Sequence, residues 1–165
     1  MTDRDTAFAD YFAARSDALR RTAYLLCGDW HRAEDLVQVT FTKLYLAWRR
    51  ITRHEALDAY ARQTLVRTFL SERRLGWFRK VQATDALPET LVDPHHPEDR
   101  LMLLAALAKV PQGQRAVLVL RYWEDMSVEE TAKTLKCSTG TVKSQAARGL
   151  QTLRGLLTVQ SSAPR

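Results

Sequence analysis

The chain has 165 residues, of which 45% are hydrophobic and 27% charged, and its formal net charge is +6. This length suits one compact domain or two small ones, and the apolar fraction supports a packed core. No apolar run approaches the ~18 uninterrupted residues of a membrane-spanning helix, and the start, MTDRDTAFADYF, lacks the features of a secretion signal. The sequence therefore predicts a cytoplasmic protein without membrane insertion.

The charge is divided along the chain. Residues 1–48 have a net charge of −1, residues 49–80 of +6, residues 81–99 of −5 and residues 100–165 of +6. Basic blocks on folded helices are the usual electrostatic signature of a protein that binds a polyanion. Two basic blocks separated by an acidic one therefore favour nucleic acid as a partner.

The N-terminal part is predicted to be helical, because apolar residues recur there at spacings of three and four. Helices are expected at about residues 6–27, 30–50 and 57–75. Gly28 suits the left-handed position that ends a helix. Asp29 suits the N-cap of the second helix, and Asp58 or a nearby residue is expected to open the third.

The segment 81–97, VQATDALPETLVDPHHP, differs in composition from the rest of the chain. It carries Pro88, Pro94 and Pro97 and no basic residue. Proline lacks an amide donor and disfavours a helix in the residue before it, so an extended acidic linker is expected here. The predicted architecture is all-α, with two small helical domains joined by a flexible linker. The predicted boundaries are residues 1–80 for the first domain, 81–97 for the linker and 98–160 for the second domain.

The C-terminal part is also predicted to be helical, and residues 128–147 match a helix-turn-helix template. Ser127 followed by Glu130 fits a capping box. Ala132 stands where the two helices touch, and Val142 is expected to bury the second helix against the first. Lys136 occupies the turn, where a left-handed backbone often requires glycine. The last helix is expected at about 139–157.

The second helix of this motif leaves a polar and cationic set of side chains on or near its outer face. They are Thr139, Thr141, Lys143, Ser144, Gln145 and Arg148. In the major groove, lysine donates to guanine and glutamine pairs with adenine, while the helix N-terminus favours phosphate. DNA binding is predicted, with an ordinary helical hairpin and a solvated face as the alternative.

The whole chain resembles the bacterial RNA polymerase sigma factors of the extracytoplasmic-function (ECF) group. AEDLVQVTFTKLY (33–45) resembles the family's helix that docks on core RNA polymerase. SVEETAKTLKCSTGTVKSQAARGLQTLR (127–154) resembles its region 4 helix-turn-helix, and the wording GTVKSQ is similar to the small actinobacterial SigE-like branch. The resemblance implies a sigma factor that binds core RNA polymerase and directs transcription from promoter −10 and −35 elements.

The resemblance also implies roles for individual residues. The docking helix carries Glu34, Asp35, Leu36, Gln38, Phe41 and Leu44. Residues 59–74 match the helix that reads the −10 element, where the cations available for DNA are Arg62, Arg67, Arg73 and Arg74. The six polar residues of the last helix match the −35 positions. Leu36 is left open between interface and core, since an apolar residue on such a helix serves either purpose.

Partners and cofactors are implied in the same way. The family's usual regulator is an anti-sigma protein, so this partner is expected beside core RNA polymerase and promoter DNA. The acidic linker either threads the polymerase toward its RNA exit path or serves as a solvated tether. No cofactor or metal is expected, because His95 and His96 on a proline-rich tether are poor ligands.

Two other classes of protein were compared with this interpretation. A self-sufficient helix-turn-helix regulator that binds an operator as a dimer is the main alternative, and the docking-helix motif disfavours it. An enzyme is disfavoured because the sequence contains no HExxH, phosphate-binding glycine loop or GxSxG motif. Cys27 and Cys137 are expected to be small buried residues and not a disulfide pair. Trp123 is expected in the core.

Overall fold

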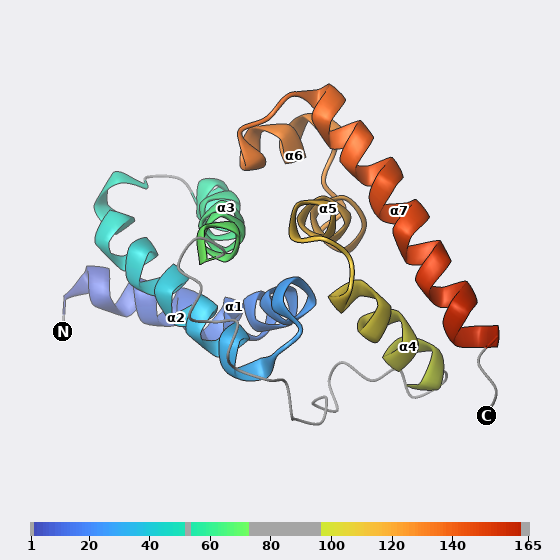
Figure 1. The fold of residues 1–165 in the computed structure, drawn as a ribbon. Coiled ribbons are helices and arrows are strands. Elements are labelled where there is room, and N and C mark those ends of the chain that lie inside the picture. The colour runs from blue at the N-terminus through green and yellow to red at the C-terminus, as the bar shows by residue number, and fades with distance from the viewer. Residues whose placement is uncertain (1, 52–53, 73–96, 163–165) are drawn as a thin grey trace.

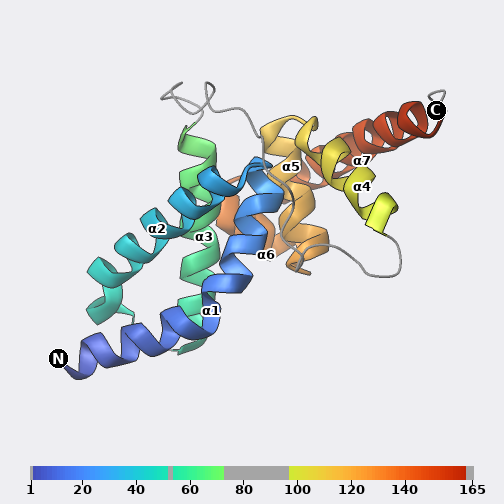
Figure 2. The same cartoon turned by 90° about the horizontal axis from the view of Figure 1, so that it is seen from below.

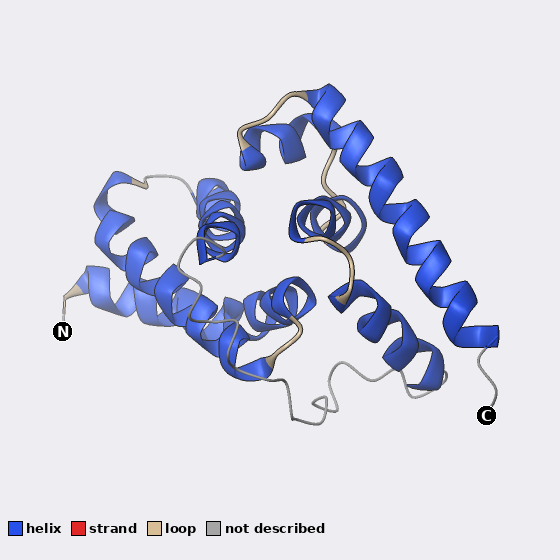
Figure 3. Ribbon diagram, viewed as in Figure 1, coloured by secondary structure: helices blue, strands red, loops and turns tan. Residues whose placement is uncertain are grey.

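The computed structural model describes residues 2–51, 54–72 and 97–162 of the chain, and every regular element in these ranges is helical (Figure 3). The N-terminal half contains α1 (Asp3–Cys27), α2 (Trp30–Ala47), the 3-10 turn η1 (Trp48–Arg50) and α3 (His54–Glu72). The C-terminal half contains α4 (Pro97–Ala108), α5 (Gln112–Leu118), the π-helical segment η4 (Val119–Trp123), α6 (Val128–Leu135) and α7 (Thr139–Ser162). The predicted all-α class is confirmed. The expected linker lies outside the described residues except for Pro97, which begins α4.

The turn between α1 and α2 forms as its sequence predicts. Gly28 has φ 74°, and its amide donates to the Tyr24 carbonyl at 2.7 Å. One Asp29 carboxylate oxygen accepts from the amides of His31 and Arg32, which caps α2. The expected third helix forms, but it begins at His54, so Asp58 lies inside α3 and does not open it. Asp58 accepts a hydrogen bond from the Tyr11 hydroxyl at 2.8 Å and therefore ties α3 to α1.

The first three helices bury a core between them. The largest fully buried side chains include Leu26, Leu36, Leu44, Leu65 and Phe69. Burial of one such side chain contributes about 1.5–3 kcal/mol. The two halves of the molecule lie side by side (Figures 1 and 2), and the same core cluster continues into the C-terminal half through residues such as Leu107, Val110 and Leu118.

A buried arginine joins the two halves beside this shared core. Arg115 of α5 is 8% exposed, and its guanidinium donates to three backbone carbonyls. They belong to Leu26 at 2.6 Å, Ala108 at 2.8 Å and Val110 at 2.7 Å. Leu26 lies in the last turn of α1, and this last turn contains no basic residue. Because the last carbonyls of a helix lack intrahelical donors and carry negative partial charge, Arg115 caps α1 from the other half.

Helices α5 and α7 approach each other closely at Gly149. A Cβ atom at this position would lie 3.0 Å from two side-chain carbons of Leu118. A side chain here would require Leu118 to shift by a few tenths of an ångström, so the absence of one at Gly149 permits the close approach of the two helices. Helix α7 runs along the outer side of the C-terminal half (Figure 1).

The two cysteines are both free thiols. Cys27 is buried as expected, whereas Cys137 is only partly buried. Burial raises the pKa of the Cys27 thiol to about 11. This thiol is therefore protonated near neutral pH, and a protonated thiol is a poor nucleophile.

Replacing Arg115 tests its role in joining the halves. Arg115→Met keeps much of the side-chain volume but leaves three carbonyls without their donor, so we expect a loss of about 3 kcal/mol in the free energy of unfolding. Urea denaturation followed by circular dichroism measures it. Arg154→Met, on the exposed side of α7, is the control and should change stability by less than about 0.5 kcal/mol. Equal effects of the two variants would contradict the role of Arg115.

Candidate nucleic-acid interface

The helix-turn-helix forms at residues 128–147 with the expected geometry. The Ser127 side chain accepts from the Glu130 amide at 3.0 Å and caps α6, which is one of the two hydrogen bonds of the predicted capping box; the return bond from the Ser127 amide to the Glu130 side chain is not formed. Lys136 ends α6 with φ 55° and ψ 48°, which confirms the predicted left-handed turn. The Cys137 amide then donates to the Ala132 carbonyl at 3.0 Å, so a free carbonyl of α6 is satisfied.

A small apolar cluster fixes the angle between α6 and α7. Ala132 is 6% exposed, Val142 is fully buried, and both pack with Val117 of α5. Leu135 and Cys137 lie partly buried at the edge of this cluster. The predicted roles of Ala132 and Val142 are therefore confirmed, and they hold the first turns of α7 against α5 and α6.

The outer face of α7 exposes most of the predicted DNA-contacting set. The exposed members are Thr139, Thr141, Lys143, Ser144 and Arg148. Ser138 caps the helix by accepting from the Thr141 amide at 3.1 Å. Helix α7 contains no acidic residue, and its N-terminus carries the positive end of the helix dipole. This surface therefore attracts an anion such as phosphate.

Gln145 differs from the prediction. It is half-buried, and its Oε1 atom is shielded from solvent without a hydrogen-bond partner. Its Nε2 atom lies 4.0 Å from the place of a Cβ on Gly113, at the start of α5. The reason is helical geometry, because Gln145 follows the buried Val142 by three positions and shares its inward face. In this structure Gln145 faces α5 and not the open surface.

The −10 candidates on α3 face the C-terminal half of the molecule. An Nη atom of Arg62 lies 4.0 Å from Glu124 Oε2. The Arg67 Nε atom donates to the Thr134 carbonyl, at the end of α6, at 3.1 Å. Arg73 and Arg74 lie outside the described residues. Both described cations are therefore engaged within the chain.

The docking helix α2 divides its predicted residues between core and surface. Leu36 and Leu44 are fully buried and Phe41 is 3% exposed, so these three side chains support the core and are not open to a partner here. This resolves the open choice for Leu36. Asp35 and Gln38 are exposed, and the half-exposed Glu34 pairs with Arg20 at 2.9 Å. Of the six predicted docking residues, only the polar ones reach the surface.

Two apolar residues of α2 were missed by the sequence analysis. Val39 is 37% exposed and Leu46 is 72% exposed. Their spacing of seven places them on one side of the helix with Asp35 and Thr42. We call these four residues, together with Gln38, the α2 stripe. It combines exposed apolar and polar groups, as a protein interface does.

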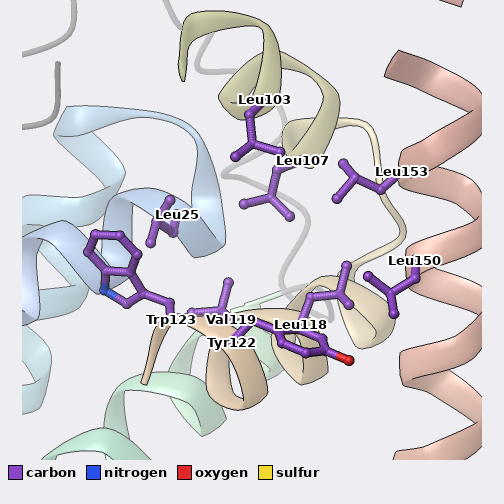
Figure 4. A pocket seen from close by; sticks show the side chains of 9 residues that line it. All are labelled: Leu25, Leu103, Leu107, Leu118, Val119, Tyr122, Trp123, Leu150 and Leu153. Carbon is purple, nitrogen blue, oxygen red and sulfur yellow. The ribbon is translucent and has the colours of Figure 1, made fainter. Parts of the chain in front are cut away.

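A second apolar surface lies where α1, α4, η4 and α7 meet. It is a groove of about 270 Å³ lined by Leu25, Leu103, Leu107, Leu118, Val119, Tyr122, Trp123, Leu150 and Leu153 (Figure 4). Trp123 is 41% exposed and not in the core as expected. The Arg100 guanidinium lies 5.6 Å from its ring centre, and that of Arg121 lies 5.7 Å from the Tyr122 ring. The groove is therefore apolar with cations beside its exposed aromatic rings.

These features define an all-helical protein with a helix-turn-helix suited to DNA and further exposed surfaces suited to protein partners. Within the described residues, no three His, Cys, Asp or Glu side chains gather into a metal-binding group. None of the described helices combines the length and the apolar character that crossing a membrane requires.

Comparison with known proteins agrees with this class. A family model for sigma-70 region 2 matches residues 12–79, and one for sigma-70 region 4 matches residues 100–153. The chain is 39% identical over 153 residues to the RNA polymerase sigma-E factor of Streptomyces coelicolor. The matched region covers 89% of this chain and 84% of that protein. It is 35% identical to the ECF RNA polymerase sigma factor SigE of Mycolicibacterium smegmatis over 89% of this chain and 60% of that protein.

A solved structure shows the same fold. It is the sigma factor RpoE of Bartonella quintana in complex with the anti-sigma factor NepR, with a TM-score of 0.75, 25% identity and coverage of 93% of this chain and 98% of that chain. This chain belongs to the ECF sigma factors of RNA polymerase. The family assignment favours a sigma factor over a self-sufficient operator-binding regulator.

The left-handed residue in the turn offers a stability test. Lys136→Gly should increase the free energy of unfolding by about 0.5–1 kcal/mol, since the strain of a non-glycine residue at positive φ outweighs the entropy that glycine loses. Chemical denaturation measures the change. Lys133→Gly, in the helical part of α6, should instead destabilise by about 1 kcal/mol. Destabilisation by both variants would contradict this account of the turn.

Proposed function

We propose that this sigma factor docks on core RNA polymerase through the α2 stripe, reads the promoter −35 element with α7 and contacts the −10 region with α3. It would act in the cytoplasm, and the polymerase would catalyse the synthesis of RNA. The observation that carries the proposal is the exposed face of α7, which presents Lys143 and Arg148 without an acidic neighbour on the same helix.

The face of α7 supports a division between base and phosphate contacts. Lys143 and Ser144 lie in the first two turns, the part of a recognition helix that reaches base edges. Lysine donates to the acceptors of guanine, and serine contacts either bases or phosphate. Arg148 lies more than one turn further on, where a phosphate contact would fix the register of the helix.

The α2 stripe supports docking on a protein surface. Leu46 exposes most of its side chain to water, and an exposed leucine beside Val39 gains free energy when a partner covers it. Asp35 and Gln38 would meet polar groups at the rim. The core side of α2 would then hold the stripe in place through three buried side chains, Leu36, Phe41 and Leu44.

We further infer that the apolar groove accepts an inhibitory protein. The solved RpoE chain with the same fold was in complex with an anti-sigma factor. The groove suits an apolar helix face, and Arg100 and Arg121 beside its aromatic rings suit acidic flanks on that helix. A peptide of this kind is the occupant proposed here.

The test of the proposed function combines two assays. Purified chain is mixed with core RNA polymerase to measure binding, and the complex then transcribes a fragmented genomic library. Stable binding with discrete new start sites supports a promoter-specific sigma factor and supplies its promoters. Tight operator binding by the chain alone, without binding to core polymerase, would contradict the proposal.

Leu46→Asp tests the α2 stripe. We expect binding to core polymerase to weaken about tenfold, because an apolar anchor is lost and a charge enters the interface. Leu101→Asp is a matched control, since Leu101 is a leucine on α4 that is 46% exposed. Fluorescence anisotropy against core polymerase compares the two. If both variants bind like the wild type, the stripe is not the docking surface.

Lys143→Ala tests the recognition face. The substitution should cost about 1–3 kcal/mol of promoter affinity in the holoenzyme, and more on promoters with guanine in the −35 element. Lys109→Ala removes the same charge from an exposed site outside the helix-turn-helix and serves as the control. Filter binding on the promoters from the library measures both. Unchanged affinity for Lys143→Ala would exclude its −35 role.

A further inference from the structure

The contact between α5 and α7 contains a polar side chain between two apolar contacts. Near the start of α7, Val142 packs with Val117 of α5. Two turns further on, Gly149 approaches Leu118 of α5. Gln145 lies between these two positions of α7, three residues after the first and four before the second, so it shares their face of the helix. Gln145 therefore belongs to the side of α7 that rests on α5 (Figure 1).

The amide of Gln145 lies against the first turn of α5. Its Nε2 atom is 4.0 Å from the place of a Cβ on Gly113, which is ordinary van der Waals contact. Its Oε1 atom is shielded from solvent and has no hydrogen-bond partner. The Oε1 atom of Gln112, also in the first turn of α5, is shielded in the same way. A shielded acceptor without a donor destabilises the folded chain, so the packing of Gln145 on α5 must offset this penalty.

This placement limits what Gln145 can do at the DNA. A glutamine that reads adenine presents both its oxygen and its nitrogen to the base edge, and here the oxygen is covered by protein. Lys143 and Ser144 are exposed instead. The reach of these two side chains to the bases depends on the angle at which α7 rests on α5. Binding groups must be held within about 0.5 Å of their productive positions, so a small change in this angle affects both residues together.

We propose that Gln145 is a positioning residue for −35 recognition: it holds α7 at its angle on α5 and makes no base contact itself. This inference rests on the proposed function of α7. Loss of a positioning side chain reduces discrimination at several −35 base pairs at once, because Lys143 and Ser144 move together. Loss of a side chain that contacts a base reduces discrimination at that base pair alone. A side chain that serves only stability affects unfolding and leaves discrimination as it is.

Three variants separate these roles. Gln145→Met keeps a long unbranched side chain with similar helix propensity and removes the shielded oxygen. Gln145→Ala removes the contact with α5. Gln151→Met makes the same chemical change at an exposed position of α7 and is the matched control. The wild type and all three variants are purified as full chains.

The first measurement is urea denaturation of the free chains. Gln145→Met should raise the midpoint by about 0.5 M, because the acceptor without a partner is gone and the packing remains. Gln145→Ala should lower the midpoint, because the space beside α5 is left unfilled. Gln151→Met should match the wild type. A midpoint for Gln145→Met at or below that of the wild type would overturn the inference, since the oxygen would then have a partner in solution.

The second measurement is −35 discrimination by the holoenzyme. Each base pair of the −35 element is replaced in turn in a promoter from the genomic library, and competition filter binding gives the relative affinities. Gln145→Ala should reduce discrimination about threefold or more at two or more base pairs. Gln145→Met should restore the wild-type pattern, because it fills the same place on α5. Gln151→Met should not change the pattern.

The remaining outcomes overturn the inference in distinct ways. Reduced discrimination at a single base pair in both Gln145 variants would show a direct base contact. Unchanged discrimination in Gln145→Ala would leave this residue a role in stability alone. Failure of Gln145→Met to restore the pattern would show that packing on α5 is not what matters. A wild-type holoenzyme without any −35 discrimination would instead contradict the proposed function of α7, and the inference with it.

Discussion

The geometry of the whole molecule depends on one arginine that reaches across it. Arg115 supplies the cation that the end of α1 lacks, and it does so from α5 on the far side of the shared core. Burial disfavours its charge and lowers its pKa. Three carbonyls and the negative end of the α1 dipole offset that cost, with no carboxylate from the described part of the chain. With this junction fixed, α3 and α6 are brought face to face and the groove beside η4 is formed.

Local sequence patterns predicted those features that depend on neighbouring residues. Gly28, Asp29 and Lys136 each satisfy a backbone requirement within a few positions, so their roles followed from residue type and spacing. Which residues of α2 are buried and which are exposed was harder to predict, because apolar residues occur on two sides of this helix. Leu36 and Leu46 are both leucines on one helix, and their opposite burial is decided by α1 and α3.

Contacts between distant segments could not be predicted from spacing. Glu124 lies 62 positions beyond Arg62, and nothing in either local pattern connects them. The same holds for Arg115, whose partner Leu26 is 89 residues away. Arginines on a helix that resembles a DNA reader are naturally assigned to DNA. Tertiary structure shows that the same guanidinium groups have protein acceptors, which local sequence could not reveal because these acceptors belong to residues 62 and 67 positions further along the chain.

The π-helical segment η4 has a consequence for the registration of the C-terminal half. A π-helical turn holds one residue more than an α-helical turn, and each residue of an α-helix rotates the chain by about 100°. Deletion of a single residue within Val119–Trp123 would therefore close this wide turn to an α-helical one, and Glu124 would keep its direction while the aromatic side chains inside the turn would move. The groove would change at Tyr122 and Trp123, whereas the contact of Glu124 with Arg62 would remain. The extra residue is thus a local insertion that shapes the groove and leaves the register of the following chain unchanged.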